Sequence, residues 1–68
     1  MKGKIKFFNE TKGYGFITED ETNKDYFLHV TGLANGLKTI AKGTHVEFEV
    51  ENDPRNGKVR ACDVKVID

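Results

Sequence analysis

The sequence predicts an all-β fold, a small closed or nearly closed barrel built from five short strands. Apolar residues alternate with polar ones over short runs, turn-forming residues separate the runs at spacings of about ten residues, and no convincing helical stretch of about twelve residues is present. The 68 residues allow one domain spanning residues 1–68. A chain of this length buries only roughly 60% of its unfolded surface and cannot support a second core.

The C-terminal half carries the clearest strand pattern. In residues 44–51, apolar side chains alternate with His45 and three glutamates, which is typical of a half-buried strand with an acidic outer face. Residues 61–67 form another β-rich run, and the segment 52–57 between the two runs holds Pro54 and an Asn-Gly turn signal. We therefore expect these two runs to form a hairpin.

Three further β-rich runs lie upstream, at residues 2–8, 13–18 and 26–31. The second of them contains Gly13 and Gly15, which weaken a strand and usually mark a bend or a close backbone approach. Residues 32–43 contain apolar side chains without a clean period, together with three glycines. We expect a long loop there, with at most one helical turn.

Charge is balanced overall but segregated along the chain. Eleven basic and eleven acidic residues cancel and the pI is about 6.7, so the chain has no strongly positive overall field that would attract nucleic acid. Residues 1–18 nevertheless carry four lysines against one glutamate, whereas residues 46–53 carry four acidic residues and no basic one. The sequence therefore still allows a basic surface patch formed by the lysines of residues 1–18.

Several functional classes are excluded by composition. Cys62 is the only cysteine and cannot form an intramolecular disulfide, and with two histidines it cannot complete the four-ligand set of a structural zinc site. We expect no metal and no cofactor. No apolar run approaches the roughly 18 residues of a membrane span, and the N-terminal residues lack a signal-peptide pattern. We expect a cytoplasmic protein with no membrane association.

Alternation within two of the runs predicts a surface of aromatic side chains. Period two places Tyr14 with Phe16 on one face, and Phe27 with His29 on a face that also carries polar Asp25. The polar neighbour predicts that this face is exposed, where aromatic rings can stack on unpaired bases. Aromatic residues in strands are more often buried, but turning these rings inward would leave Ile17 outside.

Two hexamers carry a resemblance to a known family. Residues 12–17, KGYGFI, and residues 25–30, DYFLHV, resemble the two ribonucleoprotein motifs of the cold-shock domain and stand at the spacing of that family. Residues 3–9 resemble its opening strand, and residues 37–50 its long loop and fourth strand. The resemblance covers essentially the whole chain. It implies a five-stranded antiparallel OB-fold barrel that binds single-stranded RNA or DNA and acts as an RNA chaperone, keeping transcripts unpaired.

The resemblance also implies which residues bind. Its binding face comprises Lys6, Phe7, Lys12, Tyr14, Phe16, Phe27 and His29. Asn9 and Asp25 are implied hydrogen-bond partners at the edge, and Arg55 matches a basic residue in the turn before the last strand.

The chain departs from the family pattern at three positions. Phe7 stands where many members have Trp, and Val30 and Leu37 stand where further aromatic residues are common, so the stacking surface is expected to be smaller at one end. Strict alternation would put Phe7 on the same face as Ile5, which is expected in the core. Phe7 therefore reaches the binding face only if the first strand bends or contains a bulge.

Two other functions compete with nucleic-acid binding. Catalysis is disfavoured because His29 beside Asp25 has no nucleophile or second carboxylate in a motif, so we expect no enzyme activity and no small-molecule substrate. The alternative is a protein-interaction barrel that docks a peptide or a ribosomal partner on the aromatic patch. Lys6 and Lys12 favour nucleic acid, because protein interfaces are depleted of lysine. We expect a monomer.

Overall fold

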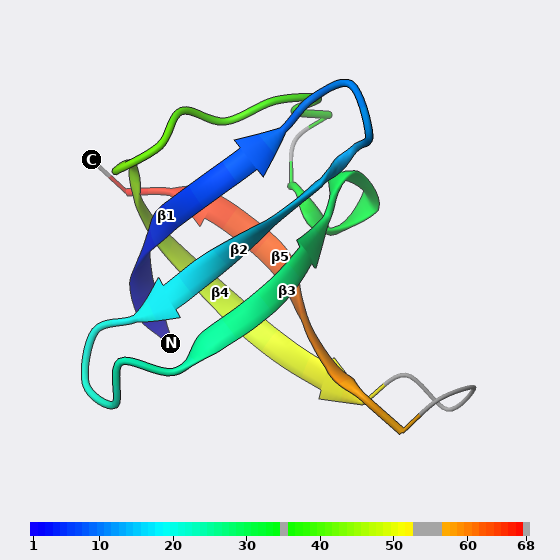
Figure 1. The fold of residues 1–68 in the computed structure, drawn as a ribbon. Helices are drawn as coiled ribbons and strands as arrows, with labels where there is room; N and C mark the ends of the chain where they lie inside the picture. The colour runs from blue at the N-terminus through cyan, green and yellow to red at the C-terminus, as the bar shows by residue number, and fades with distance from the viewer. Residues whose placement is uncertain (35, 53–56, 68) are drawn as a thin grey trace.

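A computed structural model describes residues 1–34, 36–52 and 57–67 and has the shape of a closed β-barrel (Figure 1). The strands in this part of the chain are β1 (Lys2–Asn9), β2 (Tyr14–Glu19), β3 (Asp25–His29), β4 (His45–Asn52) and β5 (Val59–Val66). A single turn of 3-10 helix, η1 (Val30–Gly32), follows β3. The order around the barrel is β1-β2-β3-β5-β4, with β4 pairing back to β1. The predicted five-stranded barrel is confirmed, and so is the hairpin of β4 and β5.

One pair of strands departs from the antiparallel arrangement that was expected throughout. β3 and β5 run parallel, with Phe27 opposite Arg60 and Leu28 opposite Ala61. The other four neighbouring pairs are antiparallel. Strand directions cannot alternate all the way around a closed ring with an odd number of members, so a five-stranded barrel must contain a parallel pair.

Each strand begins or ends one or two residues from the predicted bounds, and two of these differences have an evident cause. The third strand ends at His29, where the chain turns into η1. The Nδ1 atom of His29 accepts a hydrogen bond from the Thr31 N–H at 3.3 Å and so caps η1. The second strand begins at Tyr14, because Gly13 lies in the preceding turn with a φ of 74°, a conformation that favours glycine. The single helical turn expected within residues 32–43 falls earlier, at η1.

The barrel interior is filled by aliphatic side chains around one ring. The buried hydrophobic residues are Ile5, Ile17, Leu28, Leu33, Ile40, Val46, Phe48, Ala61 and Val64. Phe48 is 1% exposed, and the partly buried Tyr26 ring packs against it with centroids 5.8 Å apart. Leu33 and Ile40 come from the irregular connection after η1, which explains why that segment carries apolar residues without a strand or helix period.

A bulge in β1 allows one strand to supply both the core and the outer surface. Ile5 pairs with Ile17 and Phe7 pairs with Phe16, so Lys6 is an extra residue in β1 and the register shifts there. Ile5 is 2% exposed, whereas Phe7 is 39% exposed. The bend that the binding-face assignment of Phe7 requires is therefore present.

Gly15 permits the close approach of β1 and β2 immediately beyond this bulge. A Cβ atom at Gly15 would lie 2.8 Å from the Cα of Phe8 and closer still to the carbonyl oxygen of Phe7. Real side chains do not tolerate such contacts with backbone atoms. Glycine at this position is therefore a packing requirement of the β1–β2 pair, as the sequence predicted.

Replacing Phe48 with alanine tests the assignment of the core. Phe48→Ala should lower the free energy of unfolding by about 3–5 kcal/mol, through lost transfer energy and the cavity left behind. Val66→Ala is the matched control, since Val66 is 45% exposed and its truncation should cost less than about 0.5 kcal/mol. Urea midpoints measure both effects. Equal losses in the two variants would show that Phe48 does not anchor the core.

Candidate nucleic-acid interface

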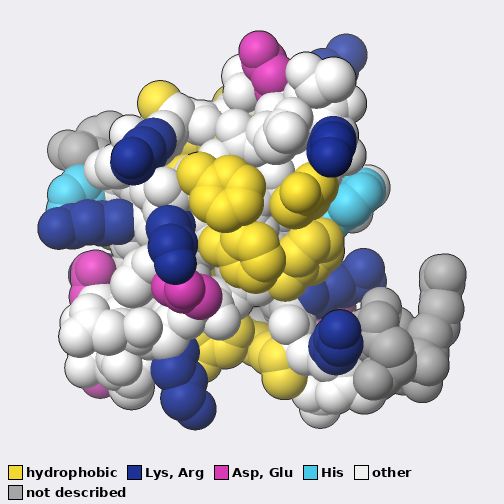
Figure 2. All heavy atoms as spheres, in the orientation of Figure 1, with side chains coloured by type: hydrophobic (Ala, Val, Ile, Leu, Met, Phe, Trp, Pro, Cys, Tyr) yellow, Lys and Arg dark blue, Asp and Glu magenta, His cyan; other side chains and the backbone are white. Residues whose placement is uncertain are grey.

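Four aromatic side chains lie together on the outer surface of β1, β2 and β3. They are Phe7, Tyr14, Phe16 and Phe27, and together they form what is called here the aromatic face. Figure 2 shows hydrophobic side chains gathered at the centre of this side of the molecule, with Lys and Arg side chains around them. Phe27 is 36% exposed and alternates with buried Leu28, so the predicted orientation of β3 is confirmed.

The four rings hold one another in place. Phe7 lies 5.5 Å from Phe16 and 6.3 Å from Tyr14, and Phe27 lies 5.8 Å from Phe16 and 6.0 Å from Tyr14, as measured between ring centroids. Each ring thus contacts two others at separations typical of favourable aromatic pairs. Cross-strand register sets these contacts, because Phe16 stands opposite both Phe7 and Phe27. The aromatic face is consequently pre-organised, which reduces the ordering cost of binding a ligand.

A carboxylate fixes the lysine at one edge of the aromatic face. Asp25 accepts hydrogen bonds from Lys6 Nζ at 2.8 Å and from Thr18 Oγ1 at 2.7 Å. These two bonds, the one from Lys6 foremost, lower the pKa of the Asp25 carboxyl group from its ordinary value. Lys6 and Asp25 are therefore in direct contact, although 19 positions separate them in the sequence.

The turn between β1 and β2 carries a second lysine. Asn9 Oδ1 accepts a hydrogen bond from the Lys12 N–H at 3.0 Å, and the Asn9 carbonyl oxygen accepts one from the Gly13 N–H at 2.8 Å. The side chain of Asn9 thus orders the turn, while Lys12 is exposed. The observed hydrogen bond of the Asn9 side chain is thus to the backbone of Lys12, and contacts of Asn9 and Lys12 with nucleic acid stay a prediction.

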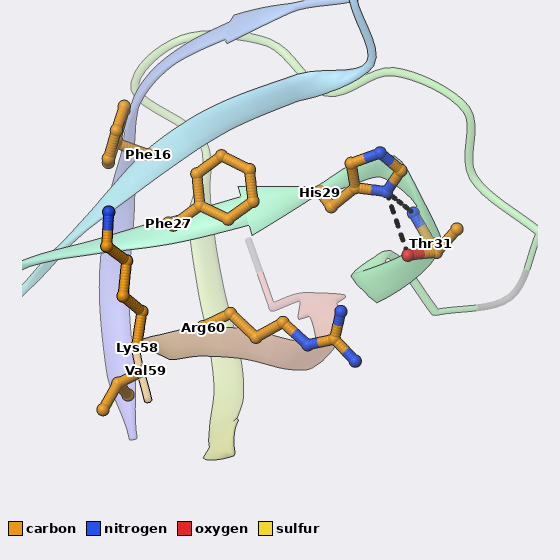
Figure 3. A pocket seen from close by; sticks show the side chains of 7 residues that line it. All are labelled: Phe16, Phe27, His29, Thr31, Lys58, Val59 and Arg60. Carbon is orange, nitrogen blue, oxygen red and sulfur yellow. Dashed lines mark hydrogen bonds between the residues drawn. The ribbon is translucent and has the colours of Figure 1, made fainter. Parts of the chain in front are cut away.

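His29 lies at the end of β3, opposite Tyr14 in the β2–β3 pair. Its Nδ1 atom is 3.0 Å from Thr31 Oγ1 and accepts the Thr31 N–H (Figure 3). A backbone amide can only donate, so the neutral ring carries its proton on Nε2. The capping interaction therefore fixes the orientation of the imidazole and leaves its other nitrogen as a donor.

A hollow of about 560 Å³ continues the aromatic face toward β5. Its lining comprises Phe16, Phe27, His29, Thr31, Lys58, Val59 and Arg60 (Figure 3). Residues 58–60 were missed by sequence reasoning, which paired the last strand only with residues 44–51. An odd number of strands in a closed barrel requires a parallel pair, but which strands form it depends on long-range pairing: β4 pairs with β1 here, and β5 therefore lies beside β3.

Four other positions were singled out in the sequence, and none of them is one of the four rings of the aromatic face. Arg55 falls outside the described residues. Val30 is half-buried and packs against the core, whereas Leu37 is 37% exposed in the long connection. Cys62 is half-buried, and burial is the main cause that raises the pKa of its thiol.

Neither a metal cluster nor a membrane span is found in the part of the chain that the structure describes. No three His, Cys, Asp or Glu side chains there are grouped so that they could hold a metal ion. No helix there is long and apolar enough to cross a membrane.

Comparison with known proteins agrees with this architecture. The profile of the "'Cold-shock' DNA-binding domain" family matches residues 1–67. The chain is 51% identical over 53 residues to cold shock-like protein CspE of Escherichia coli (strain K12), covering 76% of this chain and 77% of that protein. It is similar to cold shock-like protein CspC of Shigella flexneri at the same identity and coverage. The chain belongs to the cold-shock domain family, whose members bind nucleic acid.

The hydrogen bonds of Asp25 predict a pH-dependent contribution to stability. A carboxyl group whose pKa is depressed by folding stabilises the native state above its unfolded pKa, about 3.9, and loses that contribution as the pH falls through the folded value. Asp25→Asn should therefore lower the urea midpoint at neutral pH. The difference in urea midpoint between Asp25→Asn and the unmodified chain should shrink progressively below about pH 4.

Lys6→Gln provides the matched comparison, because it removes the lysine whose hydrogen bond is the main cause of the low pKa of Asp25. The urea midpoint of this variant should therefore change less with pH over the same acidic range. A midpoint difference for Asp25→Asn that is as large at about pH 2.5 as at neutral pH would contradict the assignment.

Proposed function

We propose that the chain binds single-stranded RNA or DNA by stacking unpaired bases on the aromatic face, with lysines at its edges contacting phosphates. The observation that carries the proposal is the outward packing of four rings on a barrel whose interior is already filled by other side chains. Exposed aromatic clusters of this kind mark binding surfaces.

Preference for single strands follows from the geometry of stacking. In a duplex each base is stacked on its neighbours, whereas an unpaired base can present a π-face to a protein ring, and each such contact contributes roughly 1–3 kcal/mol. A protein that binds only the open form shifts the folding equilibrium of an RNA without ATP. The proposed role is therefore that of an RNA chaperone, monomeric and cytoplasmic, with no covalent step and no enzyme activity.

Docking of a peptide on the same rings is the competing function. Lys6 precedes Phe7 in β1 and Lys12 lies in the turn before Tyr14, and lysine is depleted in protein interfaces but suits a phosphate backbone. These two lysines support nucleic acid as the ligand.

Alanine substitution of Phe27 tests the stacking role. Phe27→Ala should weaken binding of a pyrimidine-rich single-stranded oligonucleotide by roughly 1–3 kcal/mol, because one stacking surface is lost. Phe16→Ala should weaken binding similarly, whereas Val66→Ala should leave affinity unchanged. Fluorescence anisotropy measures affinity, and urea midpoints confirm that the variants are folded. If both alanine variants unfold as readily as Phe48→Ala, or bind as well as the unmodified chain, the stacking role is wrong.

The local basic surface predicts a modest salt dependence. Single-strand binding falls with a log-log slope of about −0.7 per neutralised phosphate, so two to four contacts from Lys6, Lys12 and their neighbours give a slope of roughly −1 to −3. The measurement is oligonucleotide affinity over a series of salt concentrations. A slope steeper than about −5 would mean that a broad electrostatic surface, rather than the aromatic face, dominates.

A further inference from the structure

One edge of β4 has no neighbouring strand along the second half of its length. β4 pairs with β1 over residues 45–47, and the Phe48 N–H donates to the Met1 carbonyl oxygen at 2.7 Å. Beyond Phe48, β4 pairs only with β5 in the part of the chain that the structure describes. Backbone groups alternate between the two edges of a strand, so the N–H and carbonyl groups of Val50 and Asn52 point to the same edge as those of Phe48. That edge of β4 is therefore open to an added strand.

The side chains along the open edge differ in chemistry between the two faces. Glu49 and Glu51 are exposed on the outer face, and Oε1 of Glu51 lies 2.8 Å from Nη2 of Arg60 on β5. Glu49 forms no ion pair with any residue that the structure describes. Val50 is half-buried and packs against the core. An added strand would thus meet negative charge on one face and an apolar side chain on the other.

The ionisation of Cys62, opposite Glu49 in the β4–β5 pair, shows the sign of the field there. Burial is the main cause that raises the pKa of the Cys62 thiol, and the carboxylates of Glu51, Asp63 and Glu49 raise it further. Arg60 lowers this pKa by less than any of the three carboxylates raises it. The field at this part of the barrel is therefore negative, although Glu51 is paired with a cation.

We propose that the open edge of β4 binds an extended protein segment in which Lys or Arg alternates with apolar residues. The segment adds a strand through backbone hydrogen bonds to Val50 and Asn52, its basic side chains lie beside Glu49 and Glu51, and its apolar side chains cover Val50. β4 passes behind β2 and β3 in Figure 1, whereas Figure 2 shows the aromatic face at the front in the same view. The inference is independent of nucleic-acid binding, and one molecule can hold both ligands.

A second copy of the chain fits this edge less well. Two β4 strands paired antiparallel about a twofold axis would place outer glutamates of one copy, such as Glu49, directly beside those of the other. Like charges at directly opposite positions destabilise a strand pair, and charged side chains on an edge strand commonly prevent this association. Charge complementarity therefore selects a basic segment as the occupant.

The binding test uses a short fluorescent peptide of alternating Lys and Val with blocked ends, and a matched peptide of alternating Glu and Val. Anisotropy at low salt should show that the basic peptide binds about tenfold more tightly than the acidic one. Glu49→Gln should weaken binding of the basic peptide by about two- to fivefold. Glu10→Gln is the matched control, because it removes an exposed carboxylate from the turn between β1 and β2 and should leave the affinity unchanged.

Two further measurements locate the bound peptide. A Lys-Val peptide that is N-methylated on alternate residues keeps its charge but loses the donors along one edge, so it should not bind. Amide hydrogen exchange of Val50 and Asn52 should slow by about tenfold or more when the unmodified Lys-Val peptide is bound, because their N–H groups then donate to the added strand. Phe27→Ala should leave the affinity for this peptide unchanged, since Phe27 lies on the aromatic face.

The outcomes that overturn the proposal are distinct from failure of the proposed function. No binding of the Lys-Val peptide, equal binding of its N-methylated form, or unchanged exchange at Val50 and Asn52 would show that β4 adds no such strand. Exchange at these amides that slows with rising protein concentration alone would assign the edge to a second copy. Loss of peptide binding in Phe27→Ala would place the peptide on the aromatic face. Oligonucleotide affinity, which tests the proposed function, is measured separately.

Discussion

The extra residue in β1 is the constraint on which the remaining architecture depends. Period-two alternation would send Ile5 and Phe7 to the same side of the strand, where one would be misplaced. With Lys6 as a bulge, Ile5 stays in a closely packed interior and Phe7 turns outward against Phe16. Lys6 itself projects to the surface and bonds to Asp25. One added residue thus positions a ring and a cation beside each other.

Closure of an odd-membered barrel provides the second element of the site. The parallel pair of β3 and β5 brings Arg60 opposite Phe27 from a strand that is remote in sequence. Lys6 and Arg60, on two sides of the rings, are each bonded to a carboxylate. A chain with zero formal net charge can therefore present cations locally, and the aromatic rings, rather than a long-range field, supply most of the expected binding energy.

Local patterns predicted much of this structure because burial follows period two wherever a strand is regular. Alternation placed Ile17 and Leu28 inside and Phe27 outside. In β4 the glutamates are exposed, as alternation predicts. The position of the bulge could not be predicted from pattern alone, because one extra residue leaves no mark in composition. The parallel pair and the lining of the hollow by Val59 and Arg60 depend on long-range pairing, which alternation does not encode. The assignment of individual residues to nucleic-acid contacts stays a prediction.

The central claim is that the outward rings bind bases that are unpaired. Its most direct test is NMR titration of the chain with a short pyrimidine-rich strand and, separately, with the same strand annealed to its complement. The account predicts that the ring protons of Phe7, Tyr14, Phe16 and Phe27 shift strongly with the single strand, as stacking requires, and change little with the duplex. Ring protons unmoved by the single strand, or moved equally by the duplex, would contradict it.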